Sequence, residues 1–129
     1  MRKIVLMWLL AVVSNNAMAE WTRIGGDDTT TDYVNLATIR ENGNIVIMWS
    51  LANFGTAQKT FDGRSFTSSK TQMEYDCKEE KKRTVAITNT SQYMGEGEVI
   101  YTATVTGDWS AIVPDSIAEI KWKIACGVK

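Results

Sequence analysis

The chain has no histidine, one proline and two cysteines among its 129 residues. Without histidine, it lacks the commonest general base of enzymes and the commonest metal ligand, which excludes imidazole-based catalysis and histidine-ligated zinc. No proline occurs before Pro114, as is typical of a chain built from paired strands. Beyond the first residues there is also no run of about twenty apolar residues, so no membrane span is expected in the remainder of the chain.

The N-terminal segment has the pattern of a secretory signal peptide. Two basic residues precede an apolar stretch at residues 4–13, and Ala17-Met18-Ala19 matches a cleavage site. Because Glu20 rather than a cysteine follows, we expect no lipoprotein anchor. The sequence therefore predicts a signal peptide at residues 1–19 and a single exported domain at residues 20–129, either periplasmic or extracellular.

The expected domain is mildly acidic. Removing the two basic residues of the signal leaves 12 Lys and Arg against 15 Asp and Glu, a net charge of −3. A domain of this charge with no concentrated basic face is unlike nucleic-acid binders and unlike proteins that bind anionic membranes. We expect neither partner.

The two cysteines, Cys77 and Cys126, allow only one pairing within the chain. Export places them in an oxidising compartment, where disulfides form and persist. We predict a Cys77–Cys126 bridge, which closes a loop of about 50 residues and is worth roughly 4 kcal/mol in the chain-entropy model.

Most of the domain has the patterns of β-strands. Residues 45–54 are apolar on both faces, which predicts a central strand covered on each side, at least at its middle. In residues 64–77, alternate side chains form two faces: one is polar and faces solvent, and the other becomes apolar near Cys77. A third clear strand is expected at residues 98–106, where apolar residues again share one face.

The connections are also predicted from local chemistry. Asn42 and Gly43 favour a type I′ hairpin turn, and the preceding residues 36–40 are expected to form a helical turn or a bend. A flexible connection is predicted at residues 55–63. The charged run at residues 78–83 is predicted to be an exposed turn before a strand that starts at Thr84.

One helix is predicted near the C-terminus. Pro114 suits the approach to its start, and either Asp115 or Ser116 can cap it. Ser116 and Glu119 match a capping box, and Gly127 stands where a C-cap glycine belongs.

The apolar face of this helix indicates that it covers a sheet. Ile117, Ile120 and Ile124 lie within about 60° of one another in projection, and Ala118, Trp122 and Ala125 extend the apolar arc. Lys121 falls within the same apolar arc and is expected to extend its ammonium group to solvent. The overall prediction is an α+β domain in which the helix packs on one face of the sheet and is tied to it by the disulfide.

Candidates for catalysis are few: an acidic loop, two pairs of carboxylates and one Ser-Lys dipeptide. The acidic loop lacks the ligand spacing of an EF-hand, and a solvated polar turn is the simpler interpretation. Paired acids in turns are usually solvated, and a Ser-Lys dipeptide in a strand points its side chains to opposite faces. We therefore predict a non-enzyme with no catalytic residue, metal or cofactor. The residues considered are Asp27, Asp28 and Asp32; Glu79 with Glu80 and Glu96 with Glu98; and Ser69 with Lys70.

Binding is the remaining class of function. Trp49 and Trp122 are expected in the core, whereas Trp21, Trp109 and Tyr93 lie beside turns and are better candidates for exposed anchors. An alternative is a small apolar ligand held between sheet and helix, in a pocket lined by Met48, Met73 and Trp122.

Several short motifs, in this order, resemble the bacterial surface-adhesin protein E family. They are the strand opening at Trp21, Asp32-Tyr33-Val34, Glu74-Tyr75-Asp76-Cys77, Gly95-Glu96-Gly97, and Val113-Pro114-Asp115-Ser116-Ile117 continuing to Cys126.

The resemblance implies an antiparallel sheet of about six strands, with the C-terminal helix on its concave face and a Cys77–Cys126 disulfide. It also implies binding to host matrix or plasma proteins through the strand that leads to the first cysteine, at residues 64–77. Arg64 and Lys70 are the partner-binding candidates there, although a solvated basic rim is the simpler interpretation of these residues. The expected partner is another protein of the envelope or outside the cell, and a second copy of the chain is a further candidate.

Overall fold

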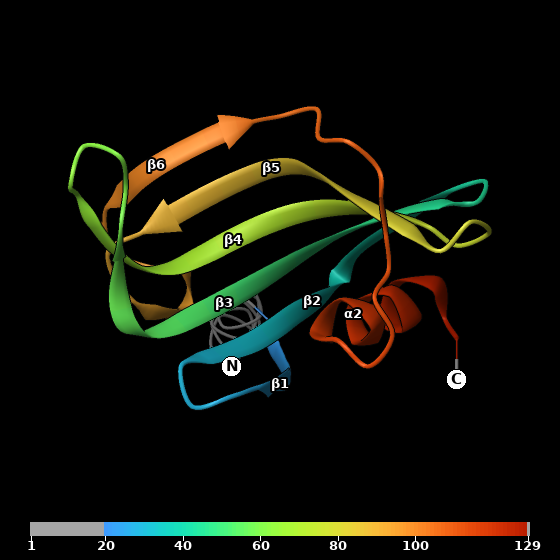
Figure 1. Cartoon of the computed structure of the whole chain (residues 1–129), viewed down its shortest axis with the longest axis horizontal. Helices are drawn as coiled ribbons and strands as arrows, with labels where there is room; N and C mark the ends of the chain where they lie inside the picture. The colour runs from blue at the N-terminus through green and yellow to red at the C-terminus, as the bar shows by residue number, and fades with distance from the viewer. Residues whose placement is uncertain (1–19, 129) are drawn as a thin grey trace, which may run out of the picture.

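The computed structural model describes residues 20–128, so the expected signal peptide at residues 1–19 lies outside the described part. The sheet has seven strands, all antiparallel to their neighbours, in the order β1-β2-β3-β4-β5-β6, with β7 paired to β5 (Figure 1). The predicted α+β class is confirmed. The strands are β1 Thr22–Gly26, β2 Thr30–Asn42, β3 Ile45–Lys59, β4 Ser65–Asp76, β5 Lys81–Thr90, β6 Val99–Thr104 and β7 Ser110–Ala111; the helices are the 3₁₀ turn η1 Tyr93–Gly95 and α2 Ile117–Cys126.

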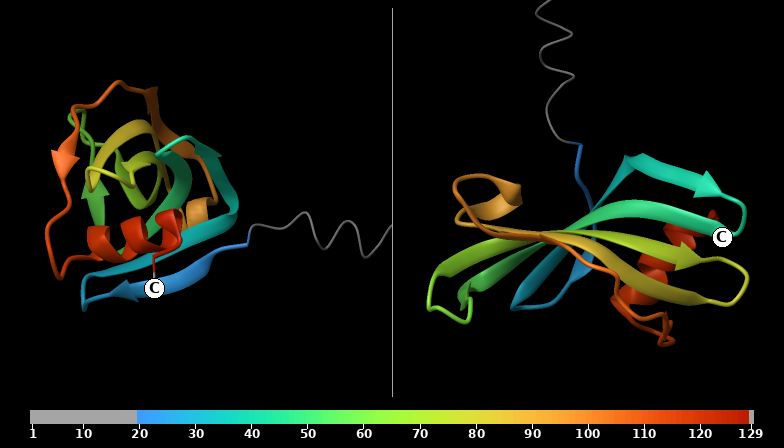
Figure 2. Two further views of the ribbon diagram at one scale, coloured as in Figure 1. Left: turned by 90° about the vertical axis from the view of Figure 1, so that its right-hand side faces the viewer. Right: turned by 90° about the horizontal axis from the view of Figure 1, so that it is seen from above.

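The sheet is strongly curved, and α2 lies on its inner side (Figure 2). The β2–β3 and β4–β5 turns reach beyond the helix at one end of the sheet, whereas the β3–β4 turn and η1 lie at the opposite end (Figure 1). We call these the helix end and the hairpin end. Short turns suffice throughout because antiparallel neighbours need no crossover.

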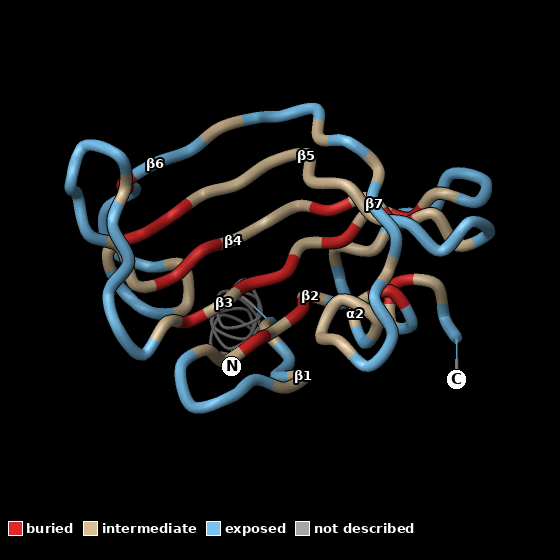
Figure 3. Tube along the Cα trace, viewed as in Figure 1, coloured by how far each residue is buried: buried red, intermediate tan, exposed pale blue. Residues whose placement is uncertain are grey.

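The core lies between α2 and the inner face of β2, β3 and β4. In the first half of β3, from Val46 to Ser50, alternate residues are buried and face β4: Val46 lies opposite Tyr75, and Met48 lies opposite Met73. Buried positions are concentrated in β2 to β4, while β6 is mostly exposed (Figure 3). The buried apolar cluster comprises Val34, Val46, Met48, Met73, Tyr75, Trp122 and Ala125.

The outer face of β3 is less covered than the sequence predicts. Trp49, expected in the core, is only half-buried, because it points away from the face that α2 covers. Cover on the outer side comes from η1 at the hairpin end, where the backbone N–H of Met94 donates to Asn53 Oδ1 at 2.8 Å.

The helix begins and ends as predicted. Ser116 Oγ accepts from the backbone N–H of Glu119 at 3.2 Å, which satisfies one of the free donors of the first turn. At the other end, Gly127 adopts φ 70°, and the N–H of Val128 donates to Lys123 O at 2.9 Å. This left-handed cap is the conformation that favours glycine.

The predicted apolar face of the helix is correct except at one edge. Trp122 and Ala125 are buried and Ile124 packs against the core, whereas Ile120 is 41% exposed. Trp122 is the largest apolar side chain of the helix, and burying its ring turns the opposite side of the helix, with Ile120, outward. Lys121 also differs from expectation, because it turns inward and pairs with Asp32 instead of reaching solvent.

Two local predictions along β2 are corrected. Residues 36–40 are not a helical turn but part of β2, with an irregular register between Asn35 and Arg40. The β2–β3 turn lies one residue later than predicted, with Gly43 and Asn44 at its centre and Asn42 paired with Ile45. Only Gly43 of the two central residues has a positive φ, so the turn is not type I′.

Two connections are shorter than expected. The β4–β5 turn occupies residues 77–80, so β5 begins at Lys81 rather than at Thr84. Strand β3 likewise continues to Lys59, which leaves a short β3–β4 turn in place of the flexible connection predicted from residue 55. In both places the pairing of neighbouring strands continues into polar or charged residues, so the strands are longer than the sequence predicts.

Candidate functional site

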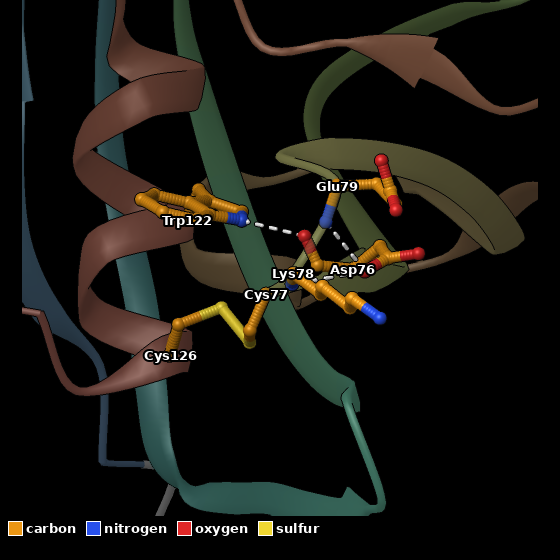
Figure 4. Close-up of a disulfide and its surroundings, with 6 residues drawn as sticks. All are labelled: Asp76, Cys77, Lys78, Glu79, Trp122 and Cys126. Atoms are coloured by element: carbon orange, nitrogen blue, oxygen red, sulfur yellow. Dashed lines mark hydrogen bonds between the residues drawn. A yellow bond between two sulfur atoms is a disulfide. The ribbon is translucent and has the colours of Figure 1, made fainter.

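The disulfide ties α2 to the end of β4. Cys77 and Cys126 are bonded, with their Cα atoms 5.7 Å apart, which confirms the predicted pairing. Next to the bridge, the indole Nε1–H of Trp122 donates to the backbone carbonyl of Asp76 at 3.0 Å (Figure 4). Asp76 Oδ1 accepts from the backbone N–H groups of Lys78 and Glu79 at 3.0 and 2.9 Å, which closes the turn that follows.

A cavity of about 330 Å³ lies between α2 and the inner face of the sheet. We call it the helix–sheet cavity. Its apolar lining includes Met73, as the sequence predicts, but neither Met48 nor Trp122, which are buried in the packed core beside it. Its polar lining consists of Ser50, Ser69, Thr71, Tyr75, Lys82 and Lys121.

A largely buried ion pair lies beside the cavity: Lys121 lines it, and its partner Asp32 does not. Lys121 Nζ lies 3.6 Å from Asp32 Oδ1, with the two side chains 18% and 12% exposed. Burial lowers the pKa of Lys121; Asp32 opposes this effect by attraction and hydrogen bonding, and the positive charge of Lys82 adds to it. The ammonium group is therefore held in a site where its charge is costly.

Stability should depend on pH through Lys121. Between its lowered pKa and the ordinary value of 10.5, the unfolded chain binds more protons than the native protein, so stability rises with pH in that window. We expect the free energy of unfolding of the wild type, relative to that of Lys121→Gln, to increase as the pH is raised towards 10.5. Urea denaturation of both proteins across that range measures the difference, and a constant or falling difference contradicts the assignment.

A second concave region lies at the hairpin end. It has a volume of about 350 Å³ and is lined by Lys59, Thr60, Phe61, Phe66, Asn89 and Tyr101. We call it the hairpin-end pocket. Phe61 is fully exposed in the β3–β4 turn, and Tyr101 is 45% exposed on β6.

Asn89 distinguishes this pocket chemically. Its side chain is only 7% exposed, and Oδ1 is the one buried side-chain oxygen or nitrogen among residues 20–128 without a hydrogen-bond partner. An unpaired buried amide oxygen is unfavourable by about 1–3 kcal/mol. Asn89 lines the pocket, so this unmet acceptor lies directly behind the pocket wall.

The predicted basic residues occupy different places. Arg64 lies just before β4 in the exposed β3–β4 turn, where Nε contacts Asp62 Oδ2 at 3.0 Å, beside the hairpin-end pocket. Lys70 lies within β4, and a Cβ added to Gly95 of η1 would come within 2.9 Å of its Cδ, so its aliphatic stem is covered by that turn. Neither residue lines the pocket, and Arg64 is the nearer in sequence, because it shares the β3–β4 turn with Thr60 and Phe61.

The predicted aromatic anchors also differ from one another. Tyr93 is 49% exposed on η1, at the hairpin end. Trp109 is half-buried beneath the guanidinium of Arg83, which lies 4.6 Å from the ring centre and also pairs with Glu74 at 2.6 Å. Trp109 is therefore held within a stacked network and is not a free anchor. Trp21 is half-buried at the start of the described chain.

The acidic loop does not gather into a site. Asp27 Oδ1 accepts from the backbone N–H groups of Thr29 and Thr30 and from the Thr29 hydroxyl, and these bonds lower its pKa. Asp32 instead faces Lys121 of the helix. Within residues 20–128, no three His, Cys, Asp or Glu side chains are arranged to hold a metal ion.

Sequence reasoning missed Phe61, Asn89 and Tyr101. Phe61 carried a usable signal, because a large apolar residue stands in a polar turn between Thr60 and Asp62. Asn89 carried none, since the lack of a partner for a buried amide depends on the three-dimensional surroundings.

The family model described as "Surface-adhesin protein E" matches residues 21–127. The chain belongs to the surface-adhesin protein E family. The match covers nearly the whole described domain, from the residue before β1 to the C-cap of α2, and it confirms the resemblance based on the ordered motifs.

Solved structures of protein E from Haemophilus influenzae share this fold. Crystal form II superposes with a TM-score of 0.66 at 14% sequence identity, over 86% of this chain and 90% of that chain. Protein E from non-typeable Haemophilus influenzae gives a TM-score of 0.64 at the same sequence identity, over 86% of this chain and 79% of that chain. A search of curated protein sequences finds no match.

Family membership assigns this domain to proteins described as surface adhesins, and so to an exported or surface role in binding. In the part of the chain that the structure describes, no helix is long and apolar enough to cross a membrane.

Proposed function

We propose that this exported domain binds another protein through the hairpin end of its sheet. The observation that carries the proposal is Phe61, a fully exposed aromatic ring at a turn, beside an aromatic pocket with an unpartnered amide at its wall. Large exposed apolar groups next to a concave, partly polar pocket are typical of protein-binding surfaces, and aromatic residues dominate the energy of such contacts.

The pocket suits a partner side chain that is partly apolar and carries a hydrogen-bond donor. Phe66 provides a fixed wall, because its ring meets that of Phe54 edge to face with the centroids 6.0 Å apart. Asn89 would accept the donor, and burial of the pair would make the bond stronger than at an exposed site.

Basic groups beside the pocket favour an acidic partner surface. Lys59 lines the pocket and Arg64 lies in the adjoining turn. The exposed contact between Arg64 and Asp62 is of the kind that contributes little to stability, so Arg64 is free to exchange it for a partner carboxylate. Lys70 is retained in the proposal as a second basic contact, approached from the side of η1.

The binding test uses purified matrix and plasma proteins, which are the partners that the family resemblance implies. Wild-type protein is expected to bind at least one of them in biolayer interferometry. Phe61→Ser should weaken that binding by at least about tenfold, or about 1.4 kcal/mol, because it removes a central aromatic anchor. Arg64→Glu combined with Lys70→Glu should weaken it further at low salt, because both changes introduce repulsion.

The matched control is Val113→Ser, which removes another exposed apolar side chain near the start of α2. It should leave binding unchanged, and all variants should unfold cooperatively like the wild type. Equal loss in Phe61→Ser and Val113→Ser, or binding that survives all the hairpin-end changes, would place the binding surface elsewhere.

A further inference from the structure

We propose that the helix–sheet cavity binds a small anionic amphiphile: a carboxylate carried on an apolar chain or ring. This site is separate from the hairpin end and carries an activity beyond protein binding. The argument rests on an excess of positive charge, on hydroxyl groups that face the cavity without a protein partner, and on an apolar wall opposite them.

The cavity has more cationic than anionic groups. Lys121 and Lys82 both line it, and Lys121 pairs with Asp32 at 3.6 Å. The two ammonium groups are close enough for Lys82 to disfavour the charge on Lys121. One carboxylate cannot neutralise two ammonium groups, so the site has an uncompensated positive charge in a partly desolvated place. A ligand carboxylate would supply the missing charge.

Hydroxyl groups that face the cavity complete the anion site. Tyr75 is 1% exposed as a whole residue and lines the cavity, and none of the side-chain hydrogen bonds of the described residues involves its hydroxyl. Ser69 is 9% exposed and also lines the cavity, and its hydroxyl is equally absent from those bonds. Neither hydroxyl is among the fully buried side-chain atoms without a partner, so both reach the cavity space, where each can donate to a ligand. A carboxylate has lone pairs enough to accept from several such donors.

The remaining wall fits an apolar body. It consists of Leu51, Phe54, Met73, Ile117 and Ala118, contributed by β3, β4 and α2. A volume of about 330 Å³ lies within the range of small-molecule sites, which is roughly 300–1,000 Å³. This is room for a medium-length acyl chain or a compact ring system, with its acid group at Lys82 and Lys121.

The combination selects against simpler ligands. A neutral apolar molecule would fill the cavity but would give the Lys82 ammonium group no counter-charge and the Tyr75 hydroxyl no acceptor, while displacing the water that reaches them. A bare anion such as acetate would satisfy the charge but leave the apolar wall uncovered. The two parts of the site are used together only by an amphiphile.

Calorimetric titration of the folded domain with decanoate, below the concentration at which it forms micelles, tests the proposal. We expect saturable binding of one molecule, with decan-1-ol and acetate each at least about tenfold weaker. Lys82→Gln and Tyr75→Phe should each weaken decanoate binding by at least about fivefold. Equal affinity for decanoate and decan-1-ol, or no binding of decanoate, overturns the proposal.

Matched variants separate the site from general effects. Lys81→Gln makes the same charge change one residue earlier, at an exposed position, and should leave decanoate binding unchanged. Lys121→Gln alone would leave the buried Asp32 carboxylate without a counter-charge. The double change Asp32→Asn with Lys121→Gln removes both charges and is therefore the suitable variant. It should also bind decanoate more weakly than the wild type. Phe61→Ser should bind decanoate like the wild type, so failure of the protein-binding surface and failure of the cavity site are distinguishable.

Discussion

Replacing Cys77 and Cys126 together with serine is expected to lower the free energy of unfolding by about 4 kcal/mol. The bridge joins residues 49 apart, and closing a loop of that length removes roughly this much entropy from the unfolded chain. A small domain has only about 5–15 kcal/mol of stability, so the loss is a large share of the total. The midpoint of thermal unfolding should fall on the order of 20 °C.

Chemical denaturation and calorimetry measure this loss directly. The double variant is preferred to either single variant, since a lone cysteine leaves a free thiol that forms dimers. Wild-type protein unfolded in the presence of reductant should reproduce the midpoint of the double variant. A double variant as stable as the oxidised wild type would show that the bridge does not stabilise the fold.

Replacing Trp122 with alanine is expected to lower the free energy of unfolding by about 3–5 kcal/mol, the range for large aromatic residues in cores. The side chain is 7% exposed and belongs to the buried cluster between α2 and the sheet. The variant also leaves the Asp76 backbone carbonyl without the indole N–H that donates to it at 3.0 Å in the wild type. Urea denaturation with circular dichroism measures the effect.

Two substitutions divide the effect of Trp122 into its parts. Trp122→Phe keeps an aromatic ring but loses the hydrogen bond, and should cost about 1–3 kcal/mol. Ile120→Ala shortens an exposed apolar side chain on the same helix and should change stability by less than about 1 kcal/mol. If Ile120→Ala were as costly as Trp122→Ala, the rotation of the helix described above would be incorrect.

Features set by local chemistry were predictable from the sequence. The caps of α2 depend on Ser116 and Gly127 acting on their own neighbours, so the pattern alone located them. Alternation along residues 64–77 likewise gave the inner face of β4, with Met73 and Tyr75 pointing into the core. The disulfide followed because only one intramolecular pairing existed.

Features set by packing were not predictable. Projection of the helix favoured Ile120 as a core residue, but the depth of the Trp122 ring and its partner on β4 decide which side faces the sheet. Lys121 was expected to reach solvent because its partner, Asp32, is far away in the chain, and no local sequence pattern links the two residues. The pocket around Asn89 was not predictable for the same reason, since its lining comes from β3, β4 and the turn between them together with β5 and β6.

The simple order of the sheet bears on how the chain reaches its native state. From β1 to β6, each strand pairs with its neighbour in sequence, so most of the sheet can assemble from successive hairpins that close short loops. The long-range step is left to the last segment, because α2 covers strands made long before it in the chain. During synthesis this segment emerges after all the strands, and until it does the inner face of the sheet is open. The interval before the helix docks is thus the time when this protein is most prone to self-association.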